Sequence, residues 1–190
     1  MNQINEILQN NGVIAFVTDT VWGIGCLPNC EKAVQRIYDI KHREAKKPLI
    51  LMSYDIYPLL EYVSQPIDKQ AQQLIKKHFP GALTLVLEKS NLTPDYITSG
   101  MQTVGIRVPK NNTFANICKS ITGGVLATTS ANLSGEQPAL TYYEALDYIG
   151  DKVDLVLKDN GDVACGKAST VAGINSNSII VYRQGDVILE

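Results

Sequence analysis

The sequence has few of the residues that most often carry nucleophilic catalysis. It contains two histidines in 190 residues, His42 and His78. Neither has a serine or cysteine partner close to it in the sequence, and the patterns H-E-x-x-H and G-x-S-x-G are both absent. We therefore expect no histidine-dependent triad.

Cysteine is also scarce. The four residues are scattered along the chain: Cys26, Cys30, Cys118 and Cys165. This is too few and too dispersed for a disulfide framework in a chain of this length. Cys26 and Cys30 would supply half of a metal site, but no second Cys/His pair accompanies them. We expect reduced, mostly structural thiols and no protein-bound metal.

The sequence lacks both a strong net charge and a long apolar run. The formal charge is -2, so nothing global attracts the protein to nucleic acid or anionic lipid, and any basic site must be local. No apolar run approaches the roughly 18 residues of a membrane span, and the N-terminus does not resemble a signal peptide. We expect a cytoplasmic protein with no membrane contact, folded as a single domain over residues 1–190.

What the sequence does contain is an alternation of helical and strand-like patterns. Helices are predicted at 4–11, 31–41, 68–79, 112–121 and 141–149, the last with a capping box of Thr141 and Glu144. Strands are predicted at 13–18, 48–52, 82–88, 104–108, 125–128, 153–157, 169–174, 178–183 and 187–190, and the stretch 19–26 is predicted to be turn-rich. This order favours one α/β domain with a mixed sheet, because the strand-rich end does not fit a purely parallel βα alternation.

Residues 161–169, GDVACGKAS, nearly match the phosphate loop G-x-x-x-x-G-K-[ST]. However, Ala168 occupies the position of the hydroxyl that binds magnesium, and the residues that follow are strand-like, so no helix N-terminus would face a phosphate. We predict instead a glycine-rich turn that leads into Ser169 and Thr170.

Two other stretches are unusual. Four basic residues fall within seven positions: Lys41, Arg43, Lys46 and Lys47. They could form a solvated helix end, since cations favour helix C-termini, or a cradle for an anion. Residues 127–136, ATTSANLSGE, place hydroxyl and amide groups directly after a buried strand, where open α/β sheets bind ligands. The alternative there is a plain Ser/Asn turn.

Taken together, seven stretches in order resemble the YrdC/TsaC family, which makes threonylcarbamoyl-adenylate. They are TDTVWGIG (18–25), KHREAKKPLILM (41–52), FPGALTLVL (79–87), TVGIRVP (103–109), TSANLSG (129–135), STV (169–171) and RQG (183–185). The first is similar to P-T-[DE]-T-V-Y-G-L-G, with Val17 for proline and Trp22 for tyrosine. The second is similar to K-x-R-P-x-x-K-P-L-I-[LV]. The resemblance implies an α/β fold: a twisted open mixed sheet flanked by helices, with a concave, positively charged groove.

The resemblance also implies a reaction. L-threonine, bicarbonate or carbon dioxide, and ATP would give L-threonylcarbamoyl-AMP and pyrophosphate, with Mg²⁺ entering as the ATP complex and no prosthetic group. The product would feed the N6-threonylcarbamoyladenosine modification at position 37 of ANN-decoding tRNAs. A downstream transferase complex of the TsaD/TsaB/TsaE type would complete that modification, and contact of this chain with tRNA itself would be weak.

Such a nucleotidyl transfer needs no protein nucleophile, only alignment of two anions and neutralisation of charge. By matched position, the resemblance assigns catalysis to Lys41, Arg43, Ser130 and Asn132. It assigns ATP binding to these four and to Lys47, Thr103 and Arg183. It assigns threonine binding to Thr20, Arg107, Thr128 and Ser169, with Arg107 as the bidentate partner of the carboxylate.

The sequence departs from the family pattern at a few positions. Glu44 stands where proline is usual, Met52 where many members carry a polar residue or histidine near the substrate, and Lys110 and Asn111 replace an acidic residue and a histidine. The chain resembles the short, single-domain type.

Two other functions stay open at this point. The first is a non-catalytic RNA-binding module, which the acidic composition disfavours. The second is a carbamoyl-adenylate step for another pathway, as in hydrogenase-maturation proteins, whose chains are much longer and include a zinc-finger region.

Overall fold

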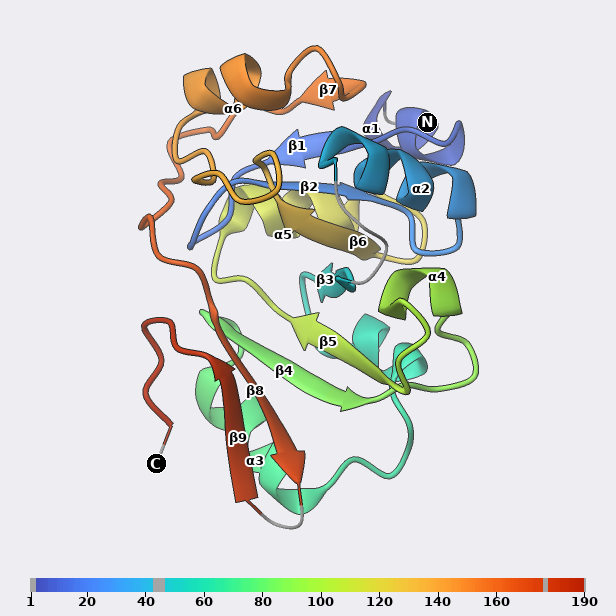
Figure 1. The fold of residues 1–190 in the computed structure, drawn as a ribbon, viewed down its shortest axis with the longest axis vertical. Coiled ribbons are helices and arrows are strands. Elements are labelled where there is room, and N and C mark those ends of the chain that lie inside the picture. The colour runs from blue at the N-terminus through green and yellow to red at the C-terminus, as the bar shows by residue number, and fades with distance from the viewer. Residues whose placement is uncertain (1–2, 43–46, 176–177, 190) are drawn as a thin grey trace.

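The computed structural model describes residues 3–42, 47–175 and 178–189. Within them, nine strands form one sheet in the order β7-β1-β2-β6-β3-β5-β4-β8-β9 (Figure 1). The strands are β1 (Ile14–Phe16), β2 (Gly23–Cys26), β3 (Ile50–Ser53), β4 (Leu83–Glu88), β5 (Thr103–Arg107), β6 (Val125–Ser130), β7 (Leu155–Val156), β8 (Thr170–Asn175) and β9 (Ser178–Arg183). The sheet contains parallel pairs such as β3–β5 and antiparallel pairs such as β3–β6, so the prediction of a mixed sheet is confirmed.

The helices are α1 (Gln3–Gln9), α2 (Glu31–Ile40), the 3₁₀ helix η1 (Tyr57–Tyr62), α3 (Lys69–His78), α4 (Asp95–Thr98), α5 (Asn112–Lys119) and α6 (Tyr142–Ile149). The five predicted helices are all present. The capping box at the start of α6 is confirmed: Thr141 Oγ1 accepts from the backbone N–H of Glu144, whose carboxylate accepts from the backbone N–H of Thr141. The short helices η1 and α4 were not predicted.

Two strand predictions were wrong. Residues 23–26 lie in the stretch predicted to be turn-rich, but they form β2, which pairs with β1 on one side and β6 on the other. Conversely, residues 187–189 form no strand, and Glu190 lies outside the described residues. Val187 instead offers its carbonyl to the side chains of Thr170 and Gln184.

The alternation of side chains along the strands produces two hydrophobic cores, one on each face of the sheet. Residues such as Ala15, Leu51 and Ala127 pack in a core with α2, α3, α4 and α6. Their sequence neighbours Phe16 and Leu126 pack in a second core with α1 and α5. Figure 1 shows α2 in front of the sheet and α5 behind it. The second face is covered over only part of its width, and the remainder is hollow.

Glycines deepen this hollow. Gly25 pairs with Thr128, which pairs with Ile50, which in turn pairs with Gly105, so the four form one row across the sheet. A Cβ atom on Gly105 would lie 2.9 Å from Ile50 Cγ2, and one on Gly25 would lie 3.0 Å from Thr128 Cγ2. Side chains at these two positions would therefore displace residues that line the cavity described below.

Among the described residues, no helix has both the length and the apolar character needed to cross a membrane.

Candidate functional site

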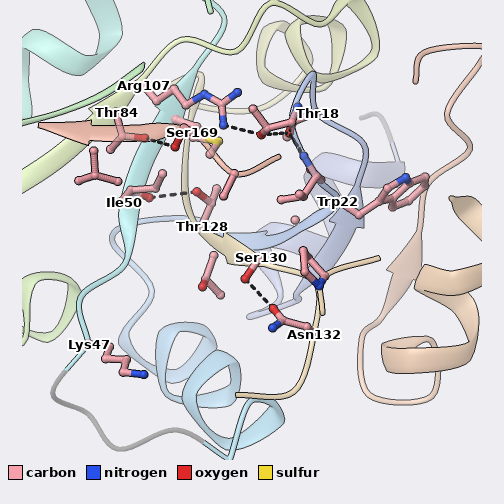
Figure 2. A pocket seen from close by; sticks show the side chains of 18 of the residues that line it. Thr18, Trp22, Lys47, Ile50, Thr84, Arg107, Thr128, Ser130, Asn132 and Ser169 are labelled. Atoms are coloured by element: carbon pink, nitrogen blue, oxygen red, sulfur yellow. Dashed lines mark hydrogen bonds between the residues drawn. The ribbon is translucent and has the colours of Figure 1, made fainter. Parts of the chain in front are cut away.

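A cavity of about 520 Å³ opens on the hollow part of the sheet, a volume typical of small-molecule sites. Side chains from β1, β3, β4, β5, β6, β8 and β9 line it, together with the turn before β2. Nine of the residues assigned from the sequence line this one cavity: Thr20, Lys41, Lys47, Arg107, Thr128, Ser130, Asn132, Ser169 and Arg183. Figure 2 shows Arg107, Thr84 and Ser169 at one end and Ser130, Asn132 and Lys47 toward the other.

The second end of the cavity is organised by a buried lysine. Lys41 is the C-cap of α2 and is 3% exposed. Its ammonium donates to the carbonyl of Ser130 at 2.6 Å, and to the carbonyl and Oδ1 of Asn132, both at 2.8 Å. Ser130 Oγ lies 3.4 Å away. Lys41 therefore fastens the S-x-N element to the end of α2, and any phosphate that reached Nζ would have to share these donors.

The S-x-N element is also held by its own bonds. Ser130 Oγ donates to Asn132 Oδ1 at 2.5 Å, and Asn132 Nδ2 donates to the carbonyl of Glu136 at 2.6 Å. The backbone of Trp22 anchors both sides of the loop, because its carbonyl accepts from Ala131 and its N–H donates to Ala139. This is an ordered loop with fixed donors and acceptors, not a plain solvent-exposed turn.

At the first end of the cavity, Arg107 is 2% exposed and is held by three partners. Nε donates to the carbonyl of Gly81 at 3.0 Å, Nη1 to Thr20 Oγ1 at 2.8 Å, and Nη2 to Asp19 Oδ1 at 2.5 Å. A guanidinium has five N–H donors. Two therefore remain for a ligand, the number that a bidentate carboxylate contact requires.

Thr20 is held beside the guanidinium by two contacts. Its Oγ1 accepts from Arg107 Nη1 and lies 3.0 Å from Thr18 Oγ1. Thr18 Oγ1 in turn donates to the carbonyl of Val21 at 2.6 Å. The Thr20 hydroxyl therefore borders the cavity next to Arg107, where a polar group of a ligand could meet it.

The wall beside Arg107 is built from Ser169, Thr84 and Arg183. Ser169 Oγ lies 2.8 Å from Thr84 Oγ1 and accepts from Arg183 Nη2 at 3.2 Å. Arg183 Nε also donates to the Ser169 carbonyl at 3.1 Å. Removal from water lowers the pKa of Arg183. Arg183, assigned to the nucleotide, thus lies against Ser169, assigned to threonine.

Two more assigned residues face the cavity with simpler surroundings. Thr128 is buried, and its hydroxyl donates to the carbonyl of Ile50 at 3.2 Å. Lys47 is exposed, and Figure 2 shows its side chain directed toward the cavity. Met52 also lines the cavity.

The two other assigned residues are Arg43 and Thr103. Arg43 lies outside the described residues, as do Glu44 and Lys46. Thr103 pairs with Glu88 at the start of β5, whereas Arg107 ends that strand. Four steps along the strand separate the two by about 13 Å, and Thr103 does not line the cavity. Its position gives no support to a contact with the nucleotide.

Sequence reasoning missed Asp19 and Thr84. Both lie inside the quoted motifs, and Thr84 interrupts the otherwise apolar stretch ALTLVL, a local signal for a polar contact on one face. Asp19 gave no such signal, because its partner Arg107 is 88 positions away.

The glycine-rich stretch 161–169 behaves as predicted. It is an irregular segment in which Gly161 and Gly166 have φ of 88° and 86°, and strand β8 follows it rather than a helix. Within the described part of the chain, no group of three or more His, Cys, Asp or Glu side chains is placed to hold a metal ion.

Gly185 provides a test of how the wall is built. A Cβ atom there would lie 2.3 Å from the Ala168 carbonyl oxygen and 2.4 Å from the Thr170 nitrogen. We expect Gly185→Ala to cost about 2–3 kcal/mol of unfolding free energy, as overpacking does, and to weaken ligand binding, because Arg183 must shift from Ser169. Urea unfolding and ligand titration would measure the two effects.

Gly100→Ala is the control for this prediction. Gly100 has φ of 77° but nothing near its Cβ position. It should lose about 1 kcal/mol from backbone strain alone and keep ligand binding. Equal binding by the two variants would contradict the proposed role of the close approach at Gly185.

The lining of this cavity includes Lys, Arg, Ser, Thr and Asn side chains beside apolar ones, with no acidic side chain and no paired nucleophile and base. Such donors suit anionic ligands. The family model of the Sua5/YciO/YrdC domain, described as "Telomere recombination", matches residues 6–185. The chain belongs to this family.

Named relatives agree. The threonylcarbamoyl-AMP synthase of Idiomarina loihiensis is 34% identical over 166 residues, 87% of this chain and 89% of the relative. That of Bacillus subtilis is 34% identical over 190 residues, 99% of this chain and 54% of the relative. The crystal structure of Pyrococcus abyssi Sua5 complexed with L-threonine superposes with a TM-score of 0.88 at 30% identity, covering 95% of this chain and 52% of that one. The chain thus spans about half the length of the latter two relatives and most of the first.

Proposed function

We propose that this chain is an L-threonylcarbamoyl-AMP synthase, a nucleotidyltransferase that uses L-threonine, bicarbonate or carbon dioxide, and Mg-ATP. The observation that carries the proposal is the division of one cavity into two ends. One end has a buried guanidinium with two N–H donors to spare beside the Thr20 hydroxyl. The other has two lysines and an ordered Ser/Asn loop. A zwitterionic amino acid suits the first end and a polyphosphate suits the second.

The reaction proceeds in two bond-forming steps. The threonine ammonium first loses a proton to solvent. The free amine then adds to carbon dioxide, forms an N–C bond and loses a second proton to solvent, which gives a carbamate. A carbamate oxygen then attacks the α-phosphorus of ATP, and the bond between that phosphorus and the bridging oxygen to the β-phosphate breaks. Pyrophosphate leaves, and L-threonylcarbamoyl-AMP remains.

Each end of the cavity has its own part in this proposal. Arg107 binds the threonine carboxylate, and Thr20 accepts from the ammonium or hydroxyl group. Thr128 and Ser169 border the same space. The contribution of this end is alignment, because an amine held close to its partner reacts as in an intramolecular reaction.

At the other end, Lys41, Lys47, Ser130 and Asn132 receive the triphosphate, and Arg183 supports the nucleotide across Ser169. Magnesium enters bound to ATP and neutralises part of the phosphate charge. The assignment of Arg43 to the same task rests on the sequence resemblance alone.

The product would serve the N6-threonylcarbamoyladenosine modification of ANN-decoding tRNAs. An acyl adenylate is a mixed anhydride that reacts with nucleophiles, so a transferase of the TsaD/TsaB/TsaE type would have to consume it. No feature of the cavity favours the alternative of a non-catalytic RNA-binding module.

One experiment tests the proposal. Purified protein with Mg-ATP should release pyrophosphate only when both L-threonine and bicarbonate are present. Release without threonine would redirect the proposal to another acceptor. An absence of release, together with tight binding of structured RNA, would favour the RNA-binding module. L-threonylcarbamoyl-AMP itself should be detected by mass spectrometry.

A further inference from the structure

Asp19 lies behind the cavity rather than in it. Its carboxylate Oδ1 accepts from Arg107 Nη2 at 2.5 Å, yet Asp19 does not line the cavity, whereas Arg107 and Thr20 both do. The Asp19 side chain is 18% exposed and that of Arg107 is 2% exposed. The aspartate therefore holds the arginine from the side that a ligand does not reach.

The turn that carries Asp19 is itself fixed. The backbone N–H of Cys165 donates to the Asp19 carbonyl at 3.2 Å, and that of Gly166 to the Thr20 carbonyl at 2.8 Å. Within the turn, the hydroxyl of Thr18 accepts from the backbone N–H groups of Thr20 and Val21. The backbone that carries the Asp19 carboxylate is thus held in place by bonds that do not depend on Arg107.

Each of the three contacts of Arg107 fixes a different nitrogen of the guanidinium. The Gly81 carbonyl and Thr20 hydroxyl are neutral acceptors on Nε and Nη1. Asp19 is the charged one, and it fixes the far nitrogen, Nη2. A charge-assisted hydrogen bond of this kind is roughly twice as strong as one between neutral groups. Without Asp19, only the two neutral contacts on Nε and Nη1 would orient the guanidinium, and Nη2 would be free to shift.

Charge leads to the same conclusion. Burial lowers the pKa of Arg107, and Arg183 lowers it further, whereas the negative charge of Asp19 is the largest influence that raises it. A buried guanidinium left with neutral partners alone would be costly. Asp19 therefore makes it possible to keep a cation here before any ligand arrives.

We propose that Asp19 is a positioning residue, which acts through Arg107 to set the two remaining N–H donors toward the carboxylate of the amino-acid substrate. This inference rests on the proposed function, since the ligand is the threonine of that reaction. Asp19 does not contact the substrate, and its effect is confined to the amino-acid end of the cavity.

The test compares Asp19→Ala, Asp19→Asn and Asp19→Glu with a matched control, Asp154→Asn. Asp154 also pairs with an arginine, at 2.8 Å from Arg36 Nη1, but it lies outside the cavity. Initial rates of pyrophosphate release give KM for threonine, KM for ATP and kcat. Calorimetric titration with L-threonine alone gives binding without catalysis, and thermal unfolding gives Tm.

We expect Asp19→Ala and Asp19→Asn to raise KM and Kd for threonine by about tenfold or more, the size of one lost charge-assisted hydrogen bond. KM for ATP and kcat at saturating threonine should stay near wild type. Asp19→Glu should recover most of the affinity, because the carboxylate is kept. Asp154→Asn should change none of these constants.

Three results would overturn the inference. An unchanged KM for threonine would show that Arg107 needs no help. A lower KM would show that Asp19 competes with the substrate. An equal loss for threonine and ATP, with a fall in Tm beyond that of the control, would show general damage. Failure of the proposed function is recognised separately, because then the wild-type protein releases no threonine-dependent pyrophosphate, while calorimetry still reports whether threonine binds and whether Asp19 matters.

Discussion

Lys41→Met lowers threonine-dependent pyrophosphate release by about 100-fold or more and lowers the unfolding free energy by about 2–4 kcal/mol. The reason is that the ammonium holds two backbone carbonyls and the Oδ1 of the S-x-N element. Methionine fills the space but donates nothing, and each buried acceptor left unpaired costs about 1–3 kcal/mol. Initial-rate assays and urea unfolding measure the two effects.

Two further variants distinguish the effect of Lys41 on the stability of the S-x-N loop from an effect on phosphate binding. Lys47→Met removes a cation that lines the same cavity but is exposed, so it should raise KM for ATP with no loss of stability. Ser130→Ala deletes the hydroxyl that bonds Asn132 but keeps the carbonyl for Lys41, so it should lower synthesis by more than about tenfold with a loss of about 1 kcal/mol. If Lys41→Met resembled Lys47→Met in both measurements, the proposed structural role of Lys41 would be wrong.

Arg107→Gln raises KM for L-threonine by about 100-fold, within the range for truncation of one partner of a buried charge pair. Glutamine retains a polar side chain but cannot offer two parallel N–H donors to a carboxylate. It also leaves the largely buried Asp19 without its cation. Steady-state kinetics with varied threonine, and separately with varied ATP, resolve the expected selectivity for the amino acid.

The control for this variant is Arg36→Gln. Arg36 also pairs with an aspartate, Asp154, but on the outside of the molecule. Its loss should leave KM for threonine unchanged, since exposed ion pairs contribute little. A normal KM for threonine in Arg107→Gln would show that the threonine carboxylate does not bind at this end of the cavity. The proposed amino-acid site would then be wrong.

The general architecture was predictable because each long element carries its own pattern. Helices with one apolar face and strands with apolar runs were enough to predict a mixed sheet. Strand β2 was not predicted, because Gly23 and Gly25 weaken the local strand pattern and the strand depends on partners on both sides. Residues 187–189 have a strand-like composition, but side-chain bonds to Val187 take the place of a ladder.

The site was predictable as a set of residues but not as a network. Matching by position in the motifs identified nine residues that the fold places around one cavity. The contact between Thr84 and Ser169 joins residues 85 positions apart, and no local pattern carries such a pairing. For Lys41, composition suggested a solvated helix end, whereas the side chain is buried against the S-x-N element. Burial of a charged residue depends on its partners in the fold.

The glycines beneath the cavity limit how the site can change. Gly25 and Gly105 have no side chain to remove, and even one methyl group at either would press on Thr128 or Ile50. Single substitutions at these two positions can therefore make the cavity shallower but not deeper.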